Sequence, residues 1–240
     1  MEHKMSGAVR PGRQHLAEGR PCQDRIRMAR GRNVVCCALA DGAGSRPSSQ
    51  LGAECVTRTV TELLAQDFER LWALEEPLVI GRILACCTQA LRELEYPIYD
   101  LACTLEFCGA HMDGRYLAGH LGDGVMILEQ CGETSVFSYP ENGEYQNETC
   151  FITEEDAKEH LRIKRGRWNE GGVLLLMSDG MADSLFQYST QTPAKVCGTL
   201  AEWIRDGDEE QVSQALAANM QTVFSKHTAD DMSLILLCWQ

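Results

Sequence analysis

Residues 34–42, VVCCALADG, consist of seven apolar residues followed by Asp41 and Gly42. An apolar run of this length that ends on Asp-Gly is typical of a buried strand followed by a turn. A second run, VLLLM at residues 173–177, ends in the same way on Ser178, Asp179 and Gly180. We therefore expect two buried strands, each of which places an aspartate at its end.

The apolar spacing around these two runs predicts the other elements. Helical spacing is found in residues 48–66, 77–94, 193–205 and 209–224. Further strands are expected at residues 104–111, 116–121, 125–129 and 232–239, the first three separated by Gly-Asp or Asp-Gly pairs. Residues 143–168 are polar, and we expect a long loop with one short helix there. Blocks of strands and blocks of helices in this order favour an α+β fold, with antiparallel sheets packed together and helices outside.

Composition narrows the class of protein. The 240 residues, 44% of them hydrophobic, suit one domain. The net charge of −13 argues against nucleic acid as a partner. We expect no membrane association and a cytoplasmic location, because the chain shows neither a signal peptide nor a membrane span. The twelve cysteines lie partly inside apolar runs and form no CxxC pair, so we expect reduced, packed thiols.

Acidic residues stand at the ends of the predicted strands. Besides Asp41 and Asp179, Asp123 follows a strand in HLGDG. Asp24 precedes the first buried strand, and residues 230–231, both Asp, precede the last strand. Converging carboxylates repel one another unless cations bind between them, and oxygen-only ligands favour Mg²⁺, Mn²⁺ or Ca²⁺ over Zn²⁺. A lone Asp-Gly is usually only a turn, so that alternative stays open for each aspartate taken singly.

Six segments in this order resemble the metal-dependent protein phosphatases of the PPM or PP2C family, and most of all its bacterial members. The segments are CQDR, VVCCALADGAGS, ACTLEF, LAGHLGDG, VLLLMSDGMADSL and TADDMSLILL. The resemblance extends from about Gly12 to the C-terminus. It implies a four-layer αββα sandwich, in which two antiparallel sheets are flanked by helices, as one domain over residues 1–240. Residues 141–168 correspond to the variable flap of the family.

The resemblance also implies the metal ligands. Asp41 bridges two metal ions, and the carbonyl of Gly42 binds one of them. Asp179 and Asp230 bind the first ion, whereas Asp231 stands where the family usually has Asn. Asp24 binds the second ion or orients a water on it.

The resemblance assigns roles to further positions besides these ligands. Asp123 and Asp183 match acids that hold a third metal ion in some members. Thr104 matches a small hydroxyl residue on a core strand, and we interpret it as a satisfied core residue. We expect packing roles for His120 and for Cys22.

Recognition of the phosphate is where the chain departs from the family. Gly19 stands where an arginine usually holds the phosphate bidentately. Arg20 is our first candidate for that role, with Arg13 and His15 as alternatives. Gln23 replaces a glutamate of some members, which implies a more weakly held second metal. A basic cluster at residues 162–167 either attracts a phosphorylated substrate or is an ordinary solvated loop.

The implied activity is that of a serine/threonine protein phosphatase in bacterial signalling. Two Mn²⁺ or Mg²⁺ ions, roughly 3.5–4 Å apart, lower the pKa of a bridging water, which attacks the phosphorus. The implied substrate is a phosphorylated protein made by a Ser/Thr kinase, and we expect a monomer. One alternative is a catalytically weak PP2C-like module that binds phosphoproteins or partners. Another is a Ca²⁺-stabilised binding domain with structural aspartates.

Overall fold

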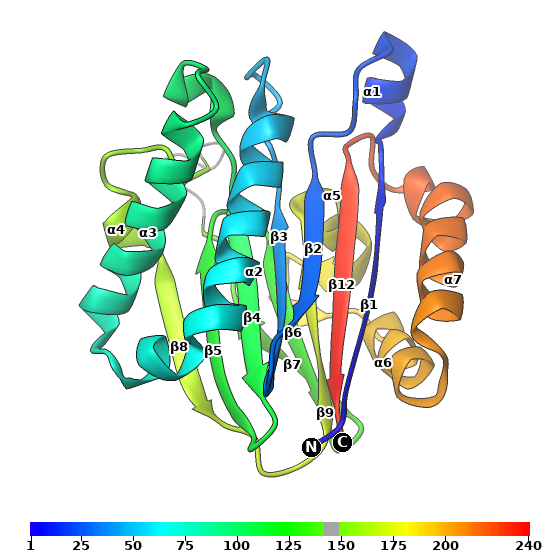
Figure 1. Ribbon diagram of the computed structural model, residues 1–240. Helices are drawn as coiled ribbons and strands as arrows, with labels where there is room; N and C mark the ends of the chain where they lie inside the picture. The colour runs from blue at the N-terminus through cyan, green and yellow to red at the C-terminus, as the bar shows by residue number, and fades with distance from the viewer. Residues whose placement is uncertain (142–148) are drawn as a thin grey trace.

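The computed structural model describes residues 1–141 and 149–240, and in this part of the chain two five-stranded antiparallel sheets stack face to face (Figure 1). The first sheet has the order β2 (Arg25–Arg30), β3 (Val34–Ala40), β4 (Leu105–His111), β5 (Arg115–Leu121) and β8 (Arg162–Arg167). The second has the order β1 (His3–Arg10), β12 (Met232–Trp239), β9 (Gly172–Met177), β6 (Val125–Gln130) and β7 (Glu133–Ser138).

Helices cover both outer faces of the stacked sheets (Figure 1). The helices α2 (Ser49–Ala73) and α3 (Glu76–Arg92) pack on the first sheet, and α5 (Asp179–Leu185), α6 (Val196–Asp206) and α7 (Glu209–Thr222) pack on the second. The predicted four-layer α+β sandwich is confirmed. The shorter elements are α1 (Arg13–Glu18), α4 (Ala157–His160), the hairpin of β10 (Phe186–Gln187) and β11 (Thr192–Pro193), and 3₁₀ turns at Ile98–Leu101 and Phe224–Lys226.

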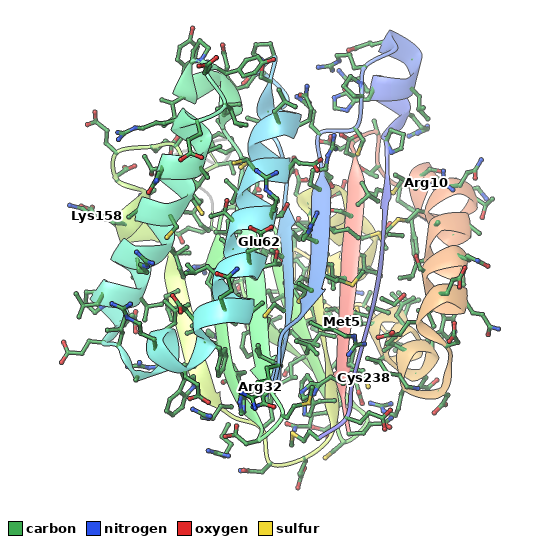
Figure 2. All side chains as sticks on the ribbon, viewed as in Figure 1. Met5, Arg10, Arg32, Glu62, Lys158 and Cys238 are labelled. Carbon is green, nitrogen blue, oxygen red and sulfur yellow. The ribbon has the colours of Figure 1, made fainter. Side chains whose placement is uncertain are left out.

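The central strands are apolar on both faces because each face meets another layer. In β3, Cys36 packs in the layer under α2 and α3, whereas the next residue, Cys37, packs between the two sheets. Trp239, at the end of β12, is fully buried between the sheets and stacks on Trp168 with ring centroids 3.7 Å apart. The side chains in Figure 2 fill both the space between the sheets and the space under the helices.

The short helix expected within residues 143–168 is confirmed as α4, but the expected loop is wrong at residues 162–167. Residues 162–167 form β8, which pairs with β5 from Arg115 opposite Arg167 to His120 opposite Arg162. β8 is an edge strand, and four of its six residues are basic, so the segment has no apolar run. Residues 142–148, the start of the expected flap, lie outside the described residues.

The basic residues of β8 contact backbone carbonyls of neighbouring segments. Arg162 donates to the carbonyl of Tyr139 at 2.7 Å, and Arg167 donates to that of Asp113 at 2.6 Å. The cluster is therefore part of the sheet edge and not a loop.

Strand pairing brings the acidic residues to one end of the sandwich. The start of β2 lies opposite the end of β3, with Arg25 paired to Ala40, which sets Asp24 beside Asp41. In the other sheet, Met177 at the end of β9 pairs with Leu234 near the start of β12 and with Val125 at the start of β6. This end carries α1 and the start of α2, opposite the chain termini (Figure 1). Within the described residues, none of the helices has the length and apolar character required to span a bilayer.

Candidate metal centre

Three aspartates from three different turns meet in one pocket. One carboxylate oxygen of each of Asp41, Asp123 and Asp179 lies within 4.8 Å of the other two. The pocket has a volume of about 130 Å³, and Gly42 and Asp230 also line it. The structure thus brings together five of the seven predicted metal-binding residues at one cavity.

Asp41 is held through its backbone by Thr104. The N–H of Asp41 donates to Thr104 Oγ1 at 2.9 Å, and the N–H of Thr104 donates to the carbonyl of Asp41 at 2.8 Å. Thr104 is buried, as predicted, but it also positions the aspartate. A Cβ at Gly42 would lie 2.9 Å from atoms of Ser49, so the turn after Asp41 packs closely on the start of α2.

Glycines allow the other two aspartates to approach. Gly122 precedes Asp123 with φ of +116°, a conformation that favours glycine, and a Cβ there would lie 2.5 Å from Thr104 Cγ2. The hydroxyl of Thr149 donates to the Asp123 carboxylate. The N–H of Gly180 donates to Asp179 Oδ1 at 2.6 Å.

Asp24 lies beneath this pocket. Its side chain is fully buried next to the hydroxyls of Ser178 and Ser233, and it has no cationic partner among the described residues. Burial raises the pKa of Asp24 to about 7. An ionised carboxylate left in this state is costly, and a cation or a proton must compensate it.

The pocket aspartates raise one another's pKa in the same way. Burial, and then the negative charge of Asp123, raises the pKa of Asp179 to about 7. Burial, and then the charges of Asp24 and Asp179, raises the pKa of Asp41 well above its usual value. An all-carboxylate set that resists ionisation when empty is the set that hard divalent cations stabilise, so these residues fit the metal implied by the sequence.

The two adjacent aspartates that precede β12, Asp230 and Asp231, have different roles. Asp230 is exposed and lines the pocket. Asp231 is buried and accepts hydrogen bonds from the N–H groups of Gly12 and Gln23 and from His15 Nδ1. Asp231 therefore ties α1 and the segment before β2 to β12. This role of Asp231 was not predicted from the sequence. The signal that could have indicated it is the presence of an acid at a position where the family usually has Asn.

The remaining predicted residues are Asp183 and the three phosphate-binding candidates, and only one of them, His15, lines the aspartate pocket. Asp183 is exposed on α5, one turn beyond Asp179. His15 lines the aspartate pocket, whereas Arg20 lines an adjoining pocket. Arg13 is exposed and donates through Nε to the carbonyl of Thr228 at 3.2 Å.

The two residues for which we expected packing roles, His120 and Cys22, are buried or half-buried. His120 is buried, with Nδ1 2.9 Å from Ser138 Oγ and Nε2 3.7 Å from the buried carboxylate of Glu106. Cys22 is half-buried, and burial followed by the charge of Asp24 raises the pKa of its thiol, which disfavours a thiolate.

Comparison with known proteins agrees with this geometry. The family model described as protein phosphatase 2C matches residues 11–221. The curated protein serine/threonine-protein phosphatase 3 of Escherichia coli (strain K12) is 28% identical over 173 residues, which cover 67% of each chain.

Solved structures share the fold at lower identity. The S. agalactiae serine/threonine phosphatase superposes with a TM-score of 0.69 at 15% identity and full coverage of both chains. Phosphatase Stp1 from Staphylococcus aureus has a TM-score of 0.67 at 14% identity, covering 100% of this chain and 96% of its own. The chain therefore belongs to the protein phosphatase 2C family, a metal-dependent family, and the predicted enzyme class, a protein-serine/threonine phosphatase, is confirmed.

Proposed function

We propose that this chain hydrolyses phosphoserine or phosphothreonine in proteins and uses two Mn²⁺ or Mg²⁺ ions to do so. The observation that carries the proposal is the convergence of Asp41, Asp123 and Asp179 within 4.8 Å, above the buried carboxylate of Asp24, which has no cationic partner among the described residues. A purely structural set of aspartates would be hydrogen-bonded or solvated, because a buried carboxylate without a partner destabilises the fold.

The position of each residue in the pocket determines its proposed role. Asp41, the Gly42 carbonyl, Asp179 and Asp230 would hold the ions, with Asp24 on the buried side. When bound, such ions lower the pKa of a coordinated water and neutralise phosphoryl oxygens.

His15 is our candidate for the group beside the phosphate. Of the three predicted candidates it is the one that lines the aspartate pocket. Its ring is buried and fixed by Asp231, so its position relative to the aspartates is set before the substrate arrives.

The test is turnover of p-nitrophenyl phosphate and of a phosphothreonine peptide with Mn²⁺ and with Mg²⁺. We expect metal-dependent hydrolysis by the wild-type chain and its loss in Asp41→Asn, with Asp206→Asn on the distant α6 as a control of equal charge change. Absence of turnover in a folded, metal-loaded chain would contradict the proposal.

One observation favours a second candidate, a catalytically weak module that binds phosphoproteins. No arginine among the described residues lines the aspartate pocket. Tight Mn²⁺ binding by calorimetry, together with phosphopeptide binding and no hydrolysis, would select this alternative. A Ca²⁺-stabilised domain would instead bind Ca²⁺ in preference to Mn²⁺ and Mg²⁺.

A further inference from the structure

A second pocket, of about 230 Å³, adjoins the aspartate pocket and shares Gln23 and Gly44 with it. It lies between the segment that follows α1 and the loop that joins β3 to α2. Its lining residues are Arg20, Pro21, Gln23, Gly44, Ser45, Arg46, Pro47 and Gln50. No described acidic side chain lines it, in a chain of net charge −13.

Both arginines keep N–H groups available to a ligand. Arg20 donates to the carbonyl of Gly44 at 3.3 Å and forms an ion pair with Glu18 at 2.6 Å. Arg46 is exposed, and its guanidinium lies 5.6 Å from the centroid of the Tyr99 ring. Since Glu18 offsets one of the two charges, the pocket has a net positive charge of about one. A guanidinium has five N–H donors, so these contacts leave several unused.

The loop that carries Arg46 is tied to the metal centre. The Gln23 amide donates to the carbonyls of Arg46, at 3.1 Å, and Ala43, at 3.4 Å. The N–H of Arg46 donates to the carbonyl of Ala43 at 2.9 Å. The loop starts at Asp41, and these contacts therefore hold the backbone of Arg46 at a fixed place relative to the aspartates. Gln23, which departs from the family's glutamate, thus has a role in shaping this loop.

We propose that this second pocket is a subsite for an anionic side chain that neighbours the phosphorylated residue of the substrate. The inference rests on the proposed function, because it needs the phosphoryl group in the aspartate pocket. An extended peptide advances by about 3.3–3.6 Å per residue, so residues close to the phosphorylated one reach a pocket that shares its wall. Carboxylate and phosphate groups are the ligands that paired guanidinium groups bind best. The chain thereby favours substrates with an Asp, a Glu or a second phosphorylated residue beside the target.

The experiment measures kcat/KM and Kd for a series of phosphothreonine peptides with the full chain and Mn²⁺. One arm carries Glu at successive positions on either side of the phosphothreonine, a second carries phosphoserine there, and the reference carries Gln. We expect a preference of about 3- to 10-fold for the anionic peptide at one or two positions, because partly exposed ion pairs contribute modestly. The two anionic arms show whether a carboxylate or a phosphate fits better.

The deciding variant is Arg46→Glu, with Arg32→Glu as the matched control. Arg32 is exposed in the turn between β2 and β3, far from the aspartates (Figure 2). Arg46→Glu should abolish or invert the preference for an anionic neighbour, measured as a ratio between peptides, and Arg32→Glu should retain it. Equal kcat/KM and Kd for all peptides, or a preference unchanged in Arg46→Glu, would overturn the subsite while the phosphatase proposal stands. If no peptide is hydrolysed, the phosphatase proposal fails, and the Kd ratio still decides the subsite.

Discussion

His15 Nδ1 lies 2.8 Å from Asp231 Oδ2, and both side chains are buried at the edge of the aspartate pocket. An ionised carboxylate only accepts hydrogen bonds, so Nδ1 of His15 carries the proton and Nε2 is the nitrogen without an assigned partner. The same carboxylate accepts from the backbone of Gly12 and of Gln23. One aspartate thus orients a pocket side chain and anchors two backbone segments.

Replacement of Asp231 should affect stability more than metal binding. Asp231→Ala leaves the buried N–H groups of Gly12 and Gln23 and the ring of His15 without their acceptor, at a cost of about 3–5 kcal/mol in the free energy of unfolding. Urea denaturation in the presence of a chelator measures it.

The neighbouring residue provides the matched control. Asp230 is exposed, so Asp230→Ala should change the metal-free stability by no more than about 0.5 kcal/mol while weakening Mn²⁺ binding. The assignment of roles is wrong if the two variants show the reverse pattern.

Removal of one charge from the aspartate cluster should stabilise the metal-free chain. The pKa of Asp41 is raised by burial and by Asp24 and Asp179, so its ionised form opposes folding. At pH 8 without metal, we expect Asp41→Asn to be more stable than the wild type, on the order of 1 kcal/mol, because the amide carries no charge to desolvate.

Saturating metal should reverse this order. Mn²⁺ at 100 times its Kd should stabilise the wild-type chain by about 2.7 kcal/mol and Asp41→Asn far less. Thermal denaturation with and without Mn²⁺ measures both effects. A wild-type melting temperature that Mn²⁺ does not change would contradict the metal centre.

Thr104→Val tests whether Thr104 positions Asp41. The substitution keeps the shape of the side chain but removes the acceptor of the Asp41 N–H, at a cost of about 1–2 kcal/mol. The misplaced aspartate should also weaken Mn²⁺ binding by about tenfold, as for residues that orient metal ligands.

A second buried threonine separates the two effects. Thr57, in α2, donates to the carbonyl of Ala53 at 2.8 Å and lies in a helix, away from the pocket lining. Thr57→Val should leave Mn²⁺ affinity, measured by calorimetry, unchanged. Equal losses of affinity in both variants would point to general destabilisation.

His3 should make the chain sensitive to acid. It is buried, neither ring nitrogen has a partner among the described residues, and burial followed by the positive N-terminus lowers its pKa to about 4. Between pH 6.5 and pH 4 the unfolded chain binds a proton at His3 that the folded chain does not, so stability falls as the pH falls. The loss attributable to His3 should be about 2–3 kcal/mol.

His3→Phe isolates this contribution. The difference in unfolding free energy between the variant and the wild type should grow in favour of the variant as the pH falls through this window. His227→Phe, at an exposed position, should follow the wild type. A difference that stays constant with pH would exclude His3 as the cause.

Strands and helices with strong local patterns were predicted closely. The terminal strand was placed at residues 232–239, where β12 runs from Met232 to Trp239. Elements with a weaker pattern were missed: β1 and β2, which contain several polar or charged residues, and β8, in which four of six residues are basic. Edge strands lack an apolar run because one side of each faces solvent, so only pairing identifies them.

Local sequence was enough to establish the apolar runs, the aspartates at their ends and the family, because these depend on residues adjacent in the chain. Folding decided the rest. Strand register and contacts between residues far apart in the chain determine that Asp231 is hydrogen-bonded and buried while Asp230 is exposed. They also determine that Thr104 holds Asp41 and that Arg20 and Arg46 line a second pocket. Asp231 is buried because Gly12, His15 and Gln23, all from a distant part of the chain, bind its carboxylate, whereas Asp230 is left exposed.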